Sequence, residues 1–259
     1  ADAGLNVMGP HRTPLDGQRW HFAHGPIGLV IGAEGDAAAV AAAHQAAWQR
    51  FQTVLAELVA ELPLLRRPVV PGDNPLRGPV ARRMWQVCAA LAVDATDFIT
   101  PMAAVAGAVA HEIAAAYATP GIARAYVNNG GDIALVLQPQ AEWRVGLVAD
   151  IARTQPALDG HFTVRGTGPV RGVATSGWRG RSHSLGIADA VTVLARSAAQ
   201  ADAAATLIAN AVNLDDPRIV RAPANSLRDD SDLGERLVTV DVPALSAAQV
   251  DDALQSGLA

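Results

Sequence analysis

The sequence predicts an α+β fold in which layered helices cover largely antiparallel sheets. Strand-like runs follow one another in hairpin order, as in residues 123–137, and no alternating strand-helix-strand pattern indicates a parallel sheet. Helical runs with recognisable ends separate the groups of strands. The chain has 259 residues, 50% of them hydrophobic, so it can bury a substantial core. We expect a single domain over residues 1–259.

The charge composition excludes several classes of function. A formal net charge of -5 argues against a protein that grips a nucleic-acid backbone, so no nucleic-acid partner is expected. All 20 basic residues are arginine, which excludes a lysine nucleophile, Schiff-base chemistry and a phosphate-binding lysine. Any anion that this protein binds must therefore be held by arginine or by backbone N–H groups.

Cysteine usage and the apolar runs bear on location. The single cysteine, Cys88, lies in a helical stretch and is expected to be a buried thiol, so neither a disulfide framework nor a cysteine-based zinc site is predicted. No apolar run reaches the length that spans a bilayer, and the first residues lack a basic region followed by an apolar run. We expect a cytoplasmic protein without a membrane partner.

The first third of the chain predicts a hairpin followed by a long helix. Residues 18–34 contain two strand-like runs joined at His24-Gly25-Pro26. Residues 36–62 have large apolar side chains at helical spacing and predict an amphipathic helix. The following residues 63–79 are rich in proline and glycine, and they predict an ordered connection that is either a lid or a subdomain boundary.

The next helix has well-specified ends and a thin middle. Thr100 is a suitable N-cap, Pro101 takes the first helical position, and Pro120-Gly121 predicts the stop. Small residues follow one another around Gly107. A glycine inside a helix is unfavourable and usually serves packing or function. We therefore expect either another backbone or a flat ligand to approach the helix there.

Residues 123–137 predict a strand, a turn and a second strand. In one interpretation this is a β-hairpin whose Asn and Gly residues supply positive φ angles. In the other, Gly130 and Gly131 bring backbone N–H groups to a ligand, with Asn129 and Asp132 as polar partners. The sequence leaves both interpretations open.

The stretch from Gly172 to Val193 reads GVATSGWRGRSHSLGIADAVTV and combines glycines, arginines and hydroxyls between two apolar runs. It can be a surface connection or an anion site. Strand-like runs at residues 143–149, 161–164 and 170–174 precede or enter it, with a turn at residues 166–169.

The helix predicted over residues 197–213 begins with a capping box and is apolar almost all round. Its polar side chains form one stripe, consisting of Asp202, Thr206, Asn210 and Asn213. A stripe of this kind is a solvated face, a subunit interface or a cation site. The carboxylate of Asp202 and the hydroxyl of Thr206 are hard oxygen ligands of the kind that Mg²⁺ accepts.

The C-terminal part predicts a strand over residues 237–242 and a capped helix from Ser246 onward. A long polar connection rich in aspartate, residues 213–235, precedes this strand. It either carries a second metal contact or is solvated, and we expect it to be solvated.

The order of these motifs resembles that of the ApbE superfamily, whose best-known members are Mg²⁺-dependent FAD:protein FMN transferases. The residues that carry the resemblance are NNGGD at 128–132, ATSG at 174–177 and ADAAAT at 201–206. MAAVAGAVA at 102–110 and the series TSG, GRS and GIADAV are more closely similar to the UPF0280 branch. The resemblance covers residues 97–213 and implies an ApbE-like, T-fold-like arrangement.

The resemblance also implies roles for individual residues. Asp202 and Thr206 match positions that bind Mg²⁺. The positions matched to the flavin site are Gly130, Gly131 and Asp132, and those matched to the loop beside it are Thr175, Ser176 and Gly177. We expect Asn129 to bind the same cofactor as a polar partner of the two glycines.

This chain departs from the transferase pattern at two places. Ala106-Gly107 stands where the transferases have Lys-Gly, and we expect Arg179 and Arg181 to replace that lysine at a pyrophosphate. The segment that contains a catalytic histidine is shortened, and His183 and Asp189 are expected to take the catalytic places.

The resemblance therefore implies a phosphate-containing ligand, FAD or FMN, with Mg²⁺, and a divergent transfer of FMN to an acceptor protein. One alternative is a flavin- or pterin-like binding protein that transfers nothing, or an enzyme with a changed reaction in the same pocket. A second alternative is an interaction or assembly protein, including a homo-oligomer. The missing lysine and the short histidine segment favour the first alternative.

Overall fold

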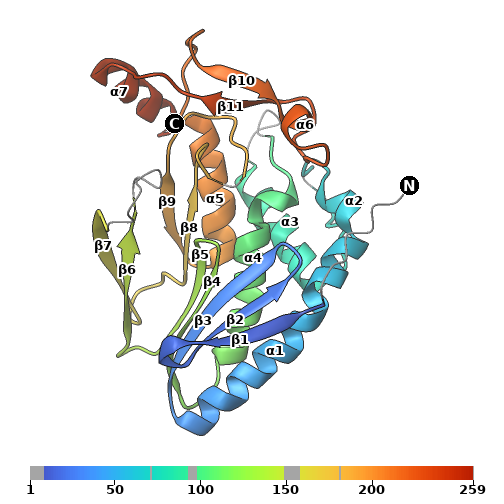
Figure 1. Cartoon of the computed structure of the whole chain (residues 1–259), viewed down its shortest axis with the longest axis vertical. Helices are drawn as coiled ribbons and strands as arrows, with labels where there is room; N and C mark the ends of the chain where they lie inside the picture. Colours follow the sequence, from blue (N-terminus) through green and yellow to red (C-terminus); the bar gives the residue numbers. More distant parts are fainter. Residues whose placement is uncertain (1–8, 71, 93–97, 149–157, 181, 259) are drawn as a thin grey trace.

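The computed structural model describes residues 9–70, 72–92, 98–148, 158–180 and 182–258, and its centre is a seven-stranded antiparallel sheet (Figure 1). The strand order is β1-β2-β3-β4-β5-β8-β9. These strands are β1 (His11–Leu15), β2 (Arg19–His24), β3 (Ile27–Gly35), β4 (Ile122–Asn129), β5 (Asp132–Leu137), β8 (Gly172–Ser176) and β9 (Val191–Ala195). The predicted α+β class with antiparallel sheets is confirmed.

Helices cover one face of this sheet (Figure 1). The longer helices are α1 (Ala37–Ala60), α3 (Pro79–Leu91), α4 (Val105–Ala114), α5 (Ala198–Ala211) and α7 (Ala247–Ser256). The short helical segments are α2 (Leu62–Leu65), α6 (Ala224–Leu227) and the 3-10 turns η1 (Asp16–Gln18), η2 (Pro101–Ala104) and η3 (Ala115–Tyr117). No helix among the described residues is both long enough and apolar enough to cross a bilayer.

The predicted N-terminal hairpin is confirmed as β2 and β3, which pair from Trp20 opposite Ile31 to His24 opposite Ile27. The N-cap residue of the helix that follows, α1, is Asp36, whose side chain accepts a hydrogen bond from the N–H of Ala39 at 3.0 Å. Sequence patterns did not predict β1, because its residues HRTPL are exposed and do not alternate between apolar and polar.

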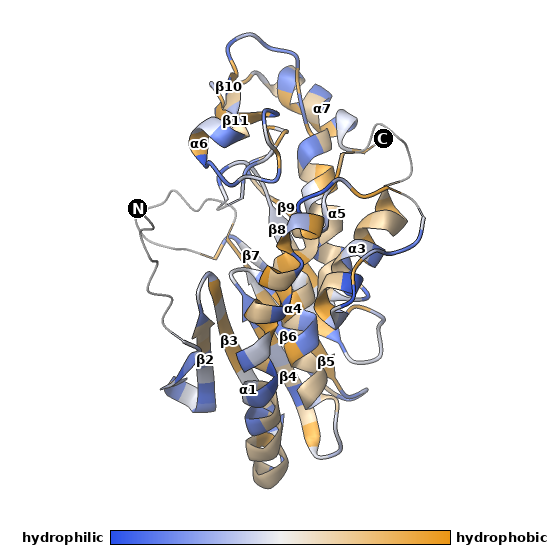
Figure 2. Ribbon diagram, turned by 90° about the vertical axis from the view of Figure 1, so that its right-hand side faces the viewer, coloured by the Kyte–Doolittle hydropathy of each residue, from blue (hydrophilic) through white to orange (hydrophobic). Residues whose placement is uncertain are grey.

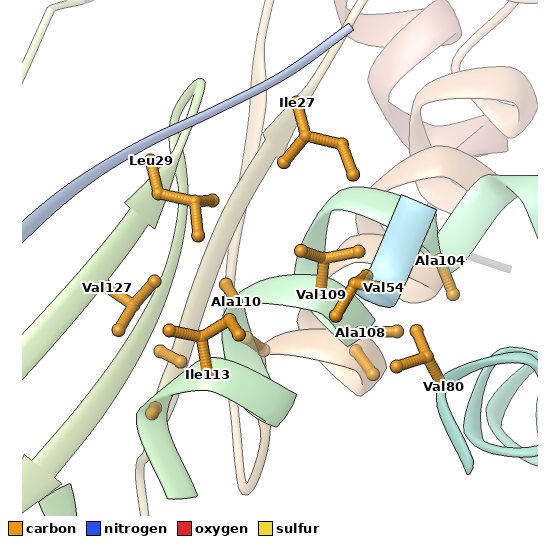
Figure 3. Close-up of a cluster of buried hydrophobic side chains, with 14 of the residues drawn as sticks. Ile27, Leu29, Val54, Val80, Ala104, Ala108, Val109, Ala110, Ile113 and Val127 are labelled. Atoms are coloured by element: carbon orange, nitrogen blue, oxygen red, sulfur yellow. The ribbon is translucent and has the colours of Figure 1, made fainter. Parts of the chain in front are cut away.

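The main core lies between the sheet and the helices, with α4 at its centre. Figure 3 shows Val109, Ala110 and Ile113 of α4 directed among side chains of the sheet and of α1 and α3. In Figure 2 the ribbon of α4 is mostly in apolar colours, whereas α1 carries hydrophilic bands. Because α4 is enclosed, its first turn can meet polar groups only from neighbouring elements.

Close backbone contacts hold α5 against α4 and β8. A Cβ atom at Gly107 would lie 2.3 Å from the carbonyl oxygen of Ala198, and one at Gly172 would lie 2.2 Å from the nitrogen of Ala198. Both glycines are therefore required by backbone approach. Of the two interpretations of the thin helix, packing against another backbone is the one observed.

A second hairpin covers part of the opposite face of the sheet. Strands β6 (Glu142–Leu147) and β7 (Gly160–Arg165) pair with each other, and their side chains form a small core with β5 and β8. Trp143 belongs to this core, and its indole N–H donates to the carbonyl of Ala125 at 3.3 Å.

The C-terminal region forms a separate small layer beside the ends of α3 and α5 (Figure 1). It contains β10 (Val220–Pro223), α6 and β11 (Leu237–Asp241). The predicted final strand and the capped helix α7 are confirmed, including both hydrogen bonds of the capping box at Ser246. The expectation of a solvated 213–235 connection was incomplete, because this segment also contributes β10, α6 and the buried Ile219 and Ala224.

The proline-rich connection over residues 63–79 packs partly into the main core. Leu65, Val69 and Leu76 are buried there, and Cys88 in the following helix is buried as expected. Glu61 accepts hydrogen bonds from the N–H groups of Arg77 and Gly78, both at 2.7 Å, and so occupies the N-terminus of α3. A lid or a boundary at this stretch stays a prediction.

Candidate functional site

The first turn of α4 is capped by a carboxylate from another helix. No side chain of its own N-cap residue bonds to it. The N–H of Gly107 instead donates to Oδ2 of Asp202 at 2.8 Å, and the N–H of Ala106 also bonds to this carboxylate. Asp202 of α5 thus satisfies two of the free N–H groups at a helix N-terminus, where a negative charge is favoured.

The end of β4 is attached to the same turn. Asn129 is buried and donates its side-chain amide to the carbonyl of Ala106 at 3.1 Å. Asn129, predicted near the ligand, therefore helps to fix the position of α4. Two segments that are distant in sequence, β4 and α5, thus supply the side-chain bonds of one helical turn.

A second carboxylate acts on the same junction from the start of β5. Oδ1 of Asp132 accepts a hydrogen bond from the backbone N–H of Thr175 at 3.3 Å, which ties β5 to the end of β8. The charge of Asp132 also lies close enough to Asp202 to raise its pKa. We call the group formed by Asn129, Asp132, Asp202 and the first turn of α4 the buried junction.

The protonation of Asp202 is strongly perturbed. Asp202 keeps some exposed surface, yet protein groups surround its carboxylate, so burial raises the pKa well above the ordinary 3.8. The neighbouring Asp132 raises this pKa further, and the hydrogen bonds from Gly107 and Ala106 only partly oppose the rise. A buried carboxylate beside a second carboxylate favours either a bound proton or a bound cation.

The oxygen donors of the buried junction fit a hard cation such as Mg²⁺. Thr206 lies one helical turn beyond Asp202 on α5 and is half-buried. Thr206 and Asp132 supply oxygen donors in addition to those of the Asp202 carboxylate. Within the described ranges, no cluster of three or more His, Cys, Asp or Glu side chains could hold a metal, so a cation here would also need oxygens from water or ligand.

The other half of the polar stripe on α5 anchors the glycine-rich loop. Oδ1 of Asn210 accepts hydrogen bonds from Ser184 Oγ at 3.1 Å and from the N–H of Leu185 at 2.9 Å. Asn213 donates to the carbonyl of Leu185 at 3.2 Å and accepts from Arg221 at 2.6 Å. Asp202, Asn210 and Asn213 thus bond within the chain, which supports neither a solvated face nor a subunit interface along this stripe.

The turn between β4 and β5 is a two-residue hairpin. Asn129 pairs with Asp132, and the glycines between them have φ angles of 67° at Gly130 and 114° at Gly131. The N–H of Gly131 donates to Oδ1 of Asn128 at 2.8 Å. The hairpin interpretation is confirmed, and one of the two glycine N–H groups already has an internal acceptor.

The loop that follows β8, residues 177–190, has the charged residues Arg179 and Asp189 at the surface among those that the structure describes. Arg179 donates to Oδ1 of Asp189 at 2.6 Å, and both side chains are exposed. The indole of Trp178 donates to the same oxygen at 3.0 Å. Gly177 lies against the backbone of Asp189, where a Cβ atom would come within 2.2 Å of its carbonyl oxygen. Ser184, Ile187 and Ala188 of the same segment are buried. We call the segment the exposed loop after its exposed charged pair.

The remaining predicted residues of this segment have varied surroundings. Thr175 is exposed and its hydroxyl lies 2.9 Å from that of Thr192 on β9, while Ser176 ends β8 and is half-buried. Arg181 lies outside the described residues.

His183 lies close enough to charged groups of the C-terminal region to respond to them, whereas Asp189 pairs with Arg179. Burial lowers the pKa of His183 from 6.5, Arg228 lowers it further, and Asp232 opposes them. Nε2 of His183 is buried and has no hydrogen-bond partner among the described residues. The two predicted catalytic residues thus contact different parts of the chain.

Two shallow recesses in the described part of the surface lie away from these residues. One has a volume of about 330 Å³ and is lined by β6 and β7 residues, including Arg144 and His161. The other has about 340 Å³ and lies at the start of α3, beside Arg82 and Arg83. Neither recess is lined by any residue that the sequence predicted for the site.

Sequence reasoning missed the backbone partner of Asp202. The sequence pattern at Ala106 and Gly107 indicated only a missing lysine and a helix with small side chains. The sequence hid this need, because Thr100 was predicted as the N-cap. In the structure Thr100 precedes the 3-10 turn η2 and its side chain makes no cap, and α4 begins only at Val105 with Ala104 as its N-cap residue, so an acceptor must come from elsewhere.

Comparisons with known proteins agree with this arrangement of motifs. The family model described as "AbpE bacteria" matches residues 11–259. A UPF0280 protein of Methanosarcina acetivorans is 31% identical over 207 residues, which cover 79% of this chain and 76% of that protein.

Two other relatives are more similar over shorter stretches. A UPF0280 protein of Methanothrix thermoacetophila is 37% identical over 167 residues, covering 63% of this chain and 66% of the relative. A UPF0280 protein of Methanopyrus kandleri is 42% identical over 147 residues, covering 55% of this chain and 56% of the relative. The chain thus spans less than two thirds of these two relatives. From the family model and the longer match, the chain belongs to the UPF0280 family.

Proposed function

We propose that this protein binds a flavin nucleotide, FAD or FMN, together with Mg²⁺ beside the buried junction. The observation that carries the proposal is the approach of Asp132 and Asp202, which come from a strand and a helix distant in sequence. Like charges in an enclosed place are costly unless a proton or a cation lies between them.

The choice of Mg²⁺ rests on the chemistry of the donors. Carboxylate and hydroxyl oxygens are hard ligands, and Mg²⁺ usually keeps water and ligand phosphate oxygens in its shell. Asp132, Asp202 and Thr206 supply such oxygens without forming a closed protein cage. Bound Mg²⁺ would neutralise charge on the phosphates of the ligand.

The choice of a phosphate-containing ligand rests on the groups around the junction. The end of β8, from Thr175 to Gly177, and the hairpin glycines offer backbone that a ligand can approach closely. Of the two arginines predicted to contact a phosphate, the structure describes Arg179, which can do so after it exchanges Asp189 for the ligand. This exchange costs little because both side chains are exposed.

The reaction that the ApbE resemblance suggests is transfer of FMN from FAD to a hydroxyl of an acceptor protein, with AMP as the leaving group. The absence of lysine and the short segment from His183 to Asp189 favour instead a protein that binds a flavin or a pterin-like ligand without transfer. The UPF0280 names of the relatives state no activity.

The test measures binding and transfer separately. Calorimetry with FAD and Mg²⁺, alone and together, reports binding, and chromatography of AMP after incubation with acceptor peptides reports transfer. We expect FAD binding that Mg²⁺ strengthens, and loss of this strengthening in Asp202→Asn. Asp230→Asn is the matched control, because Asp230 is an exposed partner of Arg66.

The outcomes separate the alternatives. Release of AMP that depends on Mg²⁺ would assign FMN transfer. Binding of FAD or FMN without AMP would assign the binding protein that transfers nothing. If neither flavin binds with or without Mg²⁺, the proposal is wrong.

A further inference from the structure

The two edges of the main sheet differ in their protection against pairing. At one edge, β1 carries His11, Arg12 and Pro14, and charge and proline on an edge strand prevent a further strand from adding. At the other edge, β9 has the sequence VTVLA, with no charge, no proline and no register shift. Within the described ranges β9 pairs with β8 alone, and Leu194 is 44% exposed.

The helix beneath this edge also has an uncharged outer face. The only charged residue of α5 is Asp202, which is directed to the first turn of α4. Its outer stripe consists of Gln200, Ala204, Ile208 and Ala211, with Ile208 37% exposed. This stripe and the edge of β9 are continuous, since α5 packs against β8 and β9. An uncharged strand edge beside an uncharged helix face is typical of a covered surface.

We propose that a second copy of this chain covers this surface, with β9 pairing antiparallel to β9 of the other copy across a two-fold axis. A register centred on Val193 keeps matching faces of the two sheets together and places Val191 opposite Ala195. Arg196 then reaches the neighbourhood of Asp189 of the other copy at each end of the ladder. Such a surface is self-complementary in shape and in charge.

The spacing of the elements allows the two helices to pack at the same time. Neighbouring strands lie about 4.8 Å apart, and α5 lies across β8 and β9. A helix midway between these strands would lie about 10 Å from its copy across the axis, which agrees with the usual helix–helix distance of about 8–10 Å. The alanines of the outer stripe permit this approach.

The proposed dimer does not involve the buried junction, although Asp189, the partner of Arg179, lies near each end of the ladder. The buried junction lies inside each copy, and no residue of the outer stripe or the edge of β9 contributes to it. A protein that binds no flavin can therefore still form the dimer, and a monomer can still bind Mg²⁺.

Sedimentation equilibrium of the full chain, with and without Mg²⁺, tests the proposal. We expect twice the chain mass for the natural sequence. Leu194→Lys and Ile208→Lys, separately and together, place like charges near the axis and should weaken the dimer by on the order of a hundredfold or more. Circular dichroism should show that the helix content is unchanged.

Two variants at other exposed apolar positions serve as controls. Val59→Lys on α1 and Leu15→Lys on β1 alter side chains that are 56% and 37% exposed, and β1 forms the opposite edge of the sheet from β9. They should leave the dimer intact. A monomeric natural protein, or a dimer that Ile208→Lys and Leu194→Lys leave unchanged, would overturn the proposal. Ile208→Lys alone decides the case if Leu194→Lys fails to fold.

Discussion

The buried junction and the exposed loop satisfy their polar groups in different ways. In the buried junction, Asp202 bonds to the first turn of α4 and Asn129 bonds to the same turn from β4, so each partner comes from a distant segment. In the exposed loop, Arg179 and Asp189 are ten residues apart and lie at the surface. The fold therefore fixes the geometry of the junction, whereas the charges of the loop can change partners at little cost.

The largest expected effect concerns the close contact that supports the junction. Gly107→Val would force a side chain against the carbonyl of Ala198, where even a Cβ atom would come within 2.3 Å. We expect a loss of about 3 kcal/mol in the free energy of unfolding, measured in urea, because backbone cannot yield as a side chain can. Gly160→Val is the control, since nothing lies within 4 Å of a Cβ atom there. Equal losses in both variants would contradict the role of Gly107.

The next prediction concerns the pH dependence that Asp202 gives to stability. The folded-state pKa of Asp202 is raised, so the folded protein holds this proton to higher pH than the unfolded chain does. Its contribution to stability is complete below the ordinary pKa of 3.8 and is lost as the pH rises through the raised value. Without Mg²⁺, the free energy of unfolding of Asp202→Asn should therefore fall less with rising pH than that of the natural protein. Urea titrations measure the free energy of unfolding at each pH. If its pH profiles in the two proteins are parallel, Asp202 does not cause the pH dependence.

A smaller effect is expected where the loop is anchored to α5. Asn210→Ala removes the acceptor for Ser184 and for the N–H of Leu185. We expect a cost of about 1–2 kcal/mol and faster hydrogen exchange in the loop, because a partly buried N–H loses its partner. Asn225→Ala, at an exposed position, should change neither quantity. Unchanged exchange at Leu185 would count against this anchor.

The smallest effect on stability is expected in the exposed loop. Arg179→Ala should change the free energy of unfolding by less than about 1 kcal/mol, as exposed ion pairs contribute little. If Arg179 contacts a ligand phosphate, the same variant should weaken FAD binding by about tenfold. Asp189→Asn should strengthen it, because it frees the arginine of a competing charge. Calorimetry that finds identical FAD affinity in all three proteins would remove Arg179 from the proposed site.

Much of the fold could be predicted from local signals in the sequence. The hairpin of β2 and β3, the capped helices α1 and α7 and the turn at Gly130-Gly131 all depend on residues close in sequence. Strands β1 and β10 could not be predicted, because they are short and owe their extended form to pairing with a neighbouring strand.

The candidate site could be predicted only in part, for a related reason. The stripe on α5 was visible in the sequence, but periodicity cannot say what a helix face meets. The structure divides the stripe into Asp202, which caps α4, and Asn210 with Asn213, which hold the loop. The pairing of the sheet strands brings Asp132 near Asp202, and the local sequence around Asp132 predicted only a turn.

The most direct test of the account is the exchange of a proton for Mg²⁺ at the buried junction. Titration of Mg²⁺ by calorimetry in two buffers of different ionisation enthalpy measures the protons released on binding. We predict binding of Mg²⁺ with release of protons at pH values near the raised pKa of Asp202, and loss of both in Asp202→Asn. Binding without proton release at every pH, or release that persists in Asp202→Asn, would contradict the account.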